Sequence, residues 1–275
     1  MAAPRSLKAQ LGRSSVRAHA RGRRHRSRLI DRFEESARRC VSLKDLRVLL
    51  GEVTGELGFS YFALLHHASL VSPAPWRIRL DNYPRRWERE LRERHRPTDD
   101  PVHMASRRTV TGFIWSDMDR IITLGPAQRR ILERSRHHGL GEGFTVPANI
   151  PGEPSGSCSF AMKEGRPLRE SRLLCAEQIG AHAFEAARRL AGLDAPPAPP
   201  RLRPRELQCL RLLARGKTDW EIAAILGISN ETARQYVKSA RAAYDVVSRT
   251  QLVVHGLRDM LIGFDDAIPP SEGMG

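Results

Sequence analysis

Long apolar runs are missing from this sequence: no stretch approaches the ~20 apolar residues that a membrane-spanning helix needs. Cysteine is also scarce, and the four cysteines are far apart without paired metal-ligand spacing: Cys40, Cys158, Cys175 and Cys209. No signal peptide is evident either. These features predict reduced core thiols in a cytoplasmic protein that does not associate with membranes.

Signatures of catalysis are missing too. The pairs at 66–67 and 137–138 are adjacent histidines, whose side chains diverge on a strand or a helix, so we expect no metal site there. The sequence contains no nucleophile elbow and no paired acid and base. An enzyme that acts on lactones is therefore disfavoured, and we expect neither a catalytic residue nor a cofactor.

Acidic residues are absent from positions 1–28, which carry nine of the basic residues behind the net charge of +15. This segment has no apolar periodicity and is predicted to be a disordered basic tail. It is interpreted as a solvated tail or an upstream start, with a nonspecific nucleic-acid arm or an organelle transit peptide as alternatives. Residues 201–263 carry eleven basic and six acidic residues, which suits a polyanionic partner.

The span 29–192 mixes helical and strand-like segments. Ser42 and Asp45 form a capping-box pattern ahead of a leucine-rich helix. We expect strands near 59–65, 76–80, 114–115, 144–148 and 158–162, and helices near 87–96, 126–138 and 168–190. This mixture predicts an α+β fold, with an α/β/α sandwich around a central sheet.

A Pro-rich run at 194–204 cannot continue a helix and is typical of a semi-rigid spacer. We therefore predict a sensor domain at 29–192, a Pro-rich linker at 193–204, an all-α DNA-binding domain of four helices at 205–263 and a flexible tail at 264–275.

The pattern after the linker is typical of a helix-turn-helix. Pro204 and Gly216 bracket a first helix. Thr218 and Glu221 form a capping box for a short second helix, and Ser229 can cap a third. That third helix has an apolar face and a neighbouring cationic face, as a major-groove reader requires. The candidate DNA contacts are Asn230, Thr232, Arg234, Gln235, Lys238 and Arg241.

Residues 201–258, especially the run from Arg205 to Ser229 with its Gly-Lys-Thr and Trp-Glu-Ile-Ala segments, resemble the LuxR-type helix-turn-helix. Tyr236 and Ala243 depart from the family's usual His and Lys, which leaves the operator sequence open. The resemblance implies transcription regulation by binding double-stranded DNA. It also implies a fourth helix, near 250–261, that pairs two copies in a homodimer, and RNA polymerase is a further candidate partner.

The order of segments in the first domain is also informative: Asn82 to Trp87, Asp99 to Val102, Phe113 to Ser116, Gly139 to Pro147 and Gly156 to Phe160. It resembles the acyl-homoserine-lactone-binding domain of LuxR-type quorum-sensing regulators.

The resemblance implies that Trp87 donates to the lactone carbonyl, Asp100 accepts from the amide, and Tyr83 or Ser159 donates to the acyl carbonyl. It also implies that Trp115 covers the ring. These roles suit the chemistry, because a buried polar head group needs partners. From the residues alone, core filling by the aromatics and a helix cap at Asp100 are the alternatives.

Leu91 departs from the family, which usually has Tyr four residues after the pocket Trp. The acyl group can therefore be unusual. The alternative is an orphan regulator of the same architecture that responds to another small molecule or to none.

Overall fold

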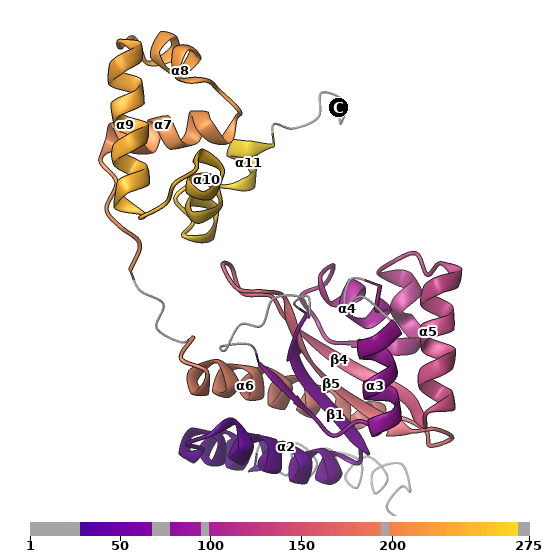
Figure 1. Cartoon of the computed structure of the whole chain (residues 1–275). Helices are drawn as coiled ribbons and strands as arrows, with labels where there is room; N and C mark the ends of the chain where they lie inside the picture. The colour runs from indigo at the N-terminus through magenta and orange to yellow at the C-terminus, as the bar shows by residue number, and fades with distance from the viewer. Residues whose placement is uncertain (1–27, 68–77, 95–98, 194–197, 269–275) are drawn as a thin grey trace, which may run out of the picture. The chain divides into compact units, whose positions relative to one another are not determined.

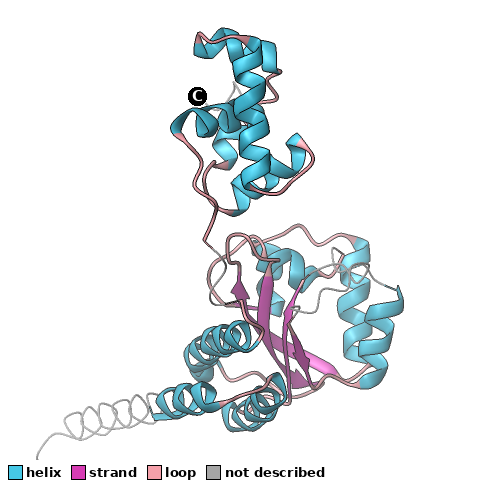
Figure 2. Ribbon diagram, turned by 60° about the vertical axis from the view of Figure 1, so that its left-hand side comes forward, coloured by secondary structure: helices cyan, strands magenta, loops and turns pink. Residues whose placement is uncertain are grey.

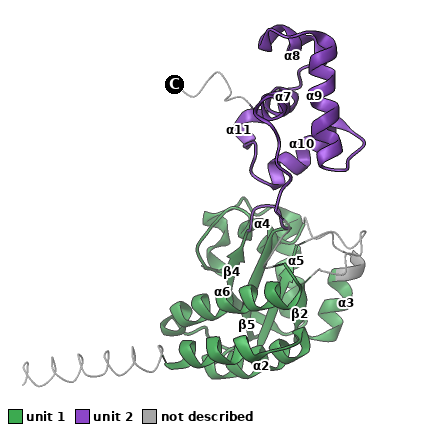
Figure 3. Ribbon diagram, turned by 90° about the vertical axis from the view of Figure 1, so that its left-hand side faces the viewer, with its two compact units in different colours: residues 1–149, 154–196 green, residues 150–153, 197–275 purple. Residues whose placement is uncertain are grey.

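The computed structural model describes residues 28–67, 78–94, 99–193 and 198–268, and only the backbone of 92–94. The basic tail predicted at 1–28 lies outside these ranges except for Arg28. Figure 1 shows the whole chain, and Figure 3 colours its two compact units. One unit comprises residues 1–149 and 154–196, and the other comprises 150–153 and 197–275. No helix within the described ranges is both long and apolar enough to span a bilayer.

The first unit is built on an antiparallel sheet of five strands in the order β2-β1-β5-β4-β3. The strands are β1 (Tyr61–His66), β2 (Arg79–Asp81), β3 (Phe113–Ile114), β4 (Leu140–Ala148) and β5 (Gly156–Lys163). The long strands β1, β4 and β5 lie at the centre, where Phe62 and Phe144 both pair with Phe160. β5 is the central strand of the five and pairs with β1 on one side and β4 on the other.

Helices cover both faces of this sheet (Figures 1 and 2). Residues 28–39, α2 (Leu43–Leu57) and α6 (Leu173–Leu190) pack on one face. The other face carries α3 (Arg85–Arg94), α4 (Pro101–Ser106) and α5 (Pro126–His137). The predicted α/β/α sandwich is confirmed.

Local sequence signals explain the helix ends. Ser42 caps α2 by accepting a hydrogen bond from the backbone N–H of Asp45, and Gly58 ends the helix with a left-handed φ of 88°. Leu46 and Leu50 recur at helical spacing and are fully buried.

Several boundaries differ from the sequence prediction. The strand expected at 76–80 forms β2 at Arg79–Asp81, and residues 76–77 lie outside the described ranges. The helix expected at 87–96 is α3, which is described over Arg85–Arg94. The strand expected at 114–115 ends at Ile114, because Trp115 opens a 3₁₀ turn, η1 (Trp115–Arg120). The helix expected from 168 begins at Leu173, after a short 3₁₀ turn, η2 (Glu170–Arg172).

The second unit is wholly helical. It contains α7 (Pro204–Ala214), α8 (Asp219–Leu226), α9 (Asn230–Ala243) and α10 (Arg249–Arg258). The predicted capping box of Thr218 and Glu221 is present, and Ser229 caps α9. Buried Glu206 accepts from the backbone N–H of Arg203 at 2.7 Å and from the Ser239 hydroxyl at 2.6 Å, which ties α7 to α9.

A correction concerns the tail expected from residue 264. Residues Phe264–Ala267 form a fifth short helix, α11, which packs against α7. Asp266 accepts from the backbone N–H of Gly263 at 3.0 Å and lies 3.7 Å from the Arg215 guanidinium. The packed unit therefore extends through α11 to Ala267.

Candidate functional site

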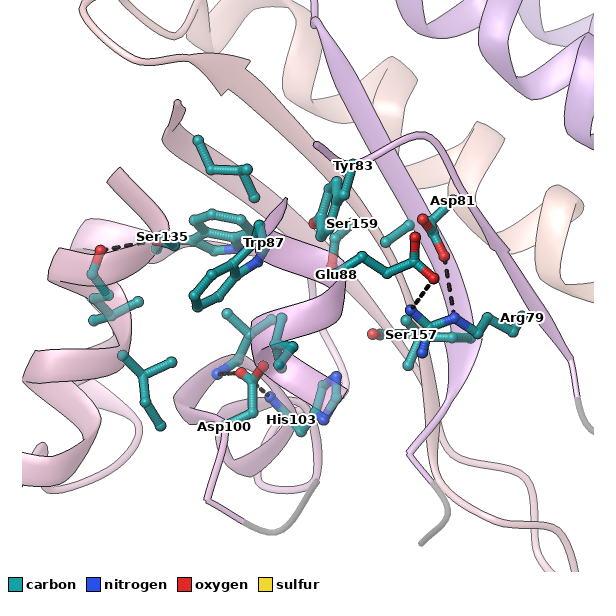
Figure 4. A pocket seen from close by; sticks show the side chains of 18 of the residues that line it. Arg79, Asp81, Tyr83, Trp87, Glu88, Asp100, His103, Ser135, Ser157 and Ser159 are labelled. Atoms are coloured by element: carbon teal, nitrogen blue, oxygen red, sulfur yellow. Dashed lines mark hydrogen bonds and ion pairs between the residues drawn. The ribbon is translucent and has the colours of Figure 1, made fainter. Parts of the chain in front are cut away.

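A pocket lies between the sheet and the helices α3, α4 and α5 (Figure 4). It gathers all six ligand-binding residues named from the sequence: Tyr83, Trp87, Leu91, Asp100, Trp115 and Ser159. Tyr83 precedes α3, which carries Trp87 and Leu91, and Asp100 is the N-cap of α4, whereas Trp115 in η1 and Ser159 in β5 come from more distant parts of the chain. Their convergence is a property of the tertiary fold.

Trp87 and Asp100 present polar atoms in an otherwise apolar part of the pocket. Trp87 is 3% exposed, and its indole N–H has no partner among the described residues. Asp100 is 7% exposed, and its Oδ1 caps α4 by accepting from the backbone N–H groups of Val102 at 2.8 Å and His103 at 3.4 Å. No described group hydrogen-bonds Oδ2. Asp100 is thus a helix cap that also keeps an acceptor available.

A chain of hydrogen bonds crosses the floor of the pocket. The Trp115 indole N–H donates to the Thr145 hydroxyl at 2.8 Å, and that hydroxyl lies 2.9 Å from the Ser159 hydroxyl. Burial raises the pKa of Tyr83, and the Asp100 and Asp81 carboxylates raise it further, so the phenol stays protonated. Thr145, which sequence reasoning missed, fixes the orientation of Trp115.

The helix wall of the pocket is tied together by Glu90 of α3. Its carboxylate accepts from His138 at 2.7 Å and pairs with Arg134 of α5. Burial opposes ionisation, but the hydrogen bonds from Arg134 and His138 lower the Glu90 pKa. The His138 ring in turn lies 5.7 Å from the Trp87 ring. Glu90 thereby holds α3, which carries Trp87, against α5.

The pocket also contains charged residues that the sequence analysis missed. Arg79 of β2 lies 3.2 Å from the Asp81 carboxylate and 3.3 Å from the Glu88 carboxylate. All three side chains line the pocket, together with Ser157 and His103. The only sequence signal for these residues was the alternation of Arg, Leu and Asp on a short strand. That alternation does not show which face of the strand lines a pocket.

The histidine pair at 66–67 diverges, as expected. His66 meets Phe184 of α6, whereas His67 stacks on His103 with ring centroids 4.0 Å apart and contacts the Ser157 hydroxyl at 2.9 Å. Burial, and then the neighbouring His103, lowers the His67 pKa well below its usual value. The described residues contain no group of three or more potential metal ligands.

A second candidate site is the outer surface of α9. Ala233, Val237 and Ala240 are buried against the other helices, as the periodicity predicts. Asn230, Arg234, Gln235 and Lys238 are exposed. Thr232 is half-buried, with its hydroxyl 2.7 Å from that of Ser229. Four of the six candidate DNA contacts are therefore exposed on the surface of α9.

Two arginines of α9 are more constrained than a helical wheel suggests. Arg234 lies 3.6 Å from the Asp219 carboxylate of α8, which also pairs with Arg249 of α10. Arg241 is half-buried, and its Nε is enclosed without a hydrogen-bond partner. Lys238 is consequently the least restrained of the three basic side chains.

Comparison with known proteins identifies both units. The family model described as autoinducer binding domain matches residues 42–190, and the model described as bacterial regulatory proteins, luxR family, matches residues 200–255. The matched segments correspond to the sheet domain and the helical domain.

Individual relatives agree with these matches. The chain is 30% identical to y4qH of Sinorhizobium fredii over 64% of this chain and 54% of that protein, so it spans about half of that relative. It is 28% identical to the quorum sensing-dependent transcriptional regulator RpaR of Rhodopseudomonas palustris, over 73% of this chain and 81% of RpaR. Among solved structures, Escherichia coli SdiA has a TM-score of 0.59 at 22% identity, covering 86% of this chain and 97% of SdiA, which shows a shared fold.

The packing of Trp115 yields a first prediction. A Cβ added to Gly143 would lie 2.4 Å from the Trp115 ring, so Gly143→Ala must displace the indole. We expect a loss of about 1–3 kcal/mol in the free energy of unfolding, measured by denaturant titration. Gly55→Ala is the matched control, because an added Cβ there has no neighbour within 4 Å. Equal stability of the two variants would contradict the claim that the Trp115 indole is tightly packed against Gly143.

Proposed function

The chain belongs to the LuxR family of bacterial regulatory proteins, a family of transcription regulators and not of enzymes, and we propose that it is a quorum-sensing regulator gated by an acyl-homoserine lactone. The ligand would occupy the pocket of the first unit, and α9 would contact DNA. The observation that carries this proposal is that an unpartnered indole N–H at Trp87 and an available carboxylate oxygen at Asp100 line one largely apolar pocket.

The head group of such a lactone matches these two atoms. Its lactone carbonyl can accept from Trp87, and its amide N–H can donate to Asp100 Oδ2. Tyr83 and Ser159 then supply hydroxyls for the acyl carbonyl, and Trp115 covers the ring. Each polar group of the ligand gains a partner, as burial requires.

The second unit would act as the DNA-reading module. An exposed face with Asn230, Arg234, Gln235 and Lys238 follows a short helix and a tight turn, which is the arrangement that enters a major groove. α10 keeps Val254 exposed and would pair two copies in a homodimer. RNA polymerase remains a candidate partner for the DNA-bound form.

Leu91 favours a second candidate function. It lines the pocket in place of the family's usual Tyr, so the wall beside Trp87 is aliphatic. The same architecture could serve an orphan regulator whose ligand is another small molecule. Binding of a lactone panel decides between the two functions.

Asp100→Asn is the sharpest test of lactone binding. Asn remains a good helix cap, so α4 should be preserved, whereas its amide would present a donor to the ligand's donor. We expect ten- to hundredfold weaker binding, or ~1.5–3 kcal/mol, by isothermal titration calorimetry. Trp87→Phe should also weaken binding, because the lactone carbonyl loses its donor. Unchanged affinity in both variants would reject the assignment of the head-group site.

Leu91→Tyr tests the departure from the family. The larger side chain should narrow the pocket and weaken binding of the native ligand by steric conflict, and straight-chain lactones should gain affinity relative to that ligand. Ligand-induced thermal shifts across lactones that differ only in the acyl group measure both effects. If no lactone stabilises either the parent protein or Leu91→Tyr, the orphan function replaces this proposal.

Lys238→Ala tests the DNA-reading face. Lys238 is exposed, so the fold should survive, and operator affinity should fall. Loss of a phosphate contact would flatten the log–log salt dependence by about one unit. Loss of a base contact would instead reduce discrimination at one position by ~1–3 kcal/mol. Lys44→Ala removes the same charge from α2 and serves as the control. The assignment of α9 fails if alanine variants of Arg234, Lys238 and Arg241 all bind like the parent.

A further inference from the structure

One end of the pocket is lined by charged side chains, which an unsubstituted alkyl chain of a ligand cannot hydrogen-bond. Arg79, whose side chain is 40% exposed, pairs with Asp81 and Glu88, whose side chains are 12% and 27% exposed. These three pocket-lining groups have a formal charge of −1; Arg47 also acts on the Asp81 carboxylate but does not line the pocket. Ser157 and His103 line the same cavity and add further polar groups.

The strand register of the sheet places Asp81 of the Arg79–Asp81–Glu88 group in the same cross-strand row as Ser159 of the head-group site. Thr145 pairs with Ser159, Ser159 with Ala63, and Ala63 with Asp81 in one row across four strands. The row begins at Thr145, which accepts a hydrogen bond from Trp115, and ends at Asp81 of the charged group. Two strand spacings, or about 10 Å, separate Ser159 from Asp81.

Figure 4 shows the same order, with Ser135 and Trp87 on one side, Arg79 and Asp81 on the other, and Tyr83 and Ser159 between them. If the lactone ring and amide lie at Trp87 and Asp100, the acyl carbonyl faces Ser159. The atoms beyond that carbonyl then lead towards Arg79, Asp81 and Glu88. This direction rests on the proposed lactone function.

We propose that the acyl group of the ligand ends in a hydroxyl that hydrogen-bonds to the Arg79–Asp81–Glu88 group. An alkyl end would displace water from three charged side chains and offer them nothing in return. A hydroxyl can donate to a carboxylate of Asp81 or Glu88 and accept from Arg79. Asp81 and Glu88 both line the pocket and would repel a terminal carboxylate, so a neutral donor is favoured. These residues therefore determine which acyl groups the pocket accepts.

The test compares acyl-homoserine lactones of equal chain length that end in a methyl, a hydroxyl or a carboxylate. Binding to the full chain is measured by calorimetry over a series of lengths. At the best length we expect the hydroxyl ligand to bind at least about tenfold more tightly than the methyl ligand, and the carboxylate ligand to bind most weakly.

Two variants test whether the charged end causes the preference for the hydroxyl ligand. The double variant Asp81→Asn and Glu88→Gln keeps size and should reduce the hydroxyl preference. The triple variant Arg79→Leu, Asp81→Leu and Glu88→Leu should reverse it in favour of the methyl ligand. The control replaces the exposed pair Asp117 and Arg120 with Leu, which should leave the preference unchanged.

The outcomes separate the two proposals. Methyl ligands that bind as tightly as hydroxyl ligands, or a preference that survives both variants, would overturn the specificity proposal and leave lactone sensing intact. Failure of every lactone to bind the parent protein would reject the proposed function, and the specificity proposal with it.

Discussion

Strand β5 must be covered on both faces, and the rest of the first unit follows from that constraint. Seven of its eight residues are buried. Cys158, Phe160 and Met162 enter the core shared with α2 and α6, whereas Ser157 and Ser159 face the pocket. Buried hydroxyls need hydrogen-bond partners, and Thr145 and His67 supply them. The polar floor of the pocket is thus a consequence of placing serines on a central strand.

The same constraint links a ligand to the stability of the protein. Trp87, Trp115 and Leu140 form a core cluster on the pocket side, separate from the larger cluster around α2 and α6. A molecule that fills the pocket adds apolar contacts to this smaller cluster and satisfies its unpartnered polar atoms. Binding to the folded state alone stabilises that state by mass action. Such coupling gives the proposed regulator a physical means of responding to its ligand.

In the helical unit, two carboxylates contact α9 and help to fix its position against the other helices. Glu206 joins the start of α7 to Ser239 of α9, while Asp219 joins α8 to Arg234 and Arg249. Arg234 therefore meets DNA only in competition with Asp219, whereas Lys238 has no such restraint. Glu206 is buried and would retain its desolvation cost if it lost one partner, so its contacts hold α7 against α9 more firmly than surface ion pairs would.

The sequence alone determined the order and type of most elements, the helix caps and the family resemblance, because caps, breakers and hydrophobic periodicity act over a few residues. The caps at Ser42, Thr218 and Ser229 are examples. Only the tertiary structure decided that Thr145 orients Trp115, that Arg241 is half-buried, and that Arg79, Asp81 and Glu88 meet at one end of the pocket. Those contacts depend on strand register and on which helix covers which face, and a one-dimensional pattern contains neither.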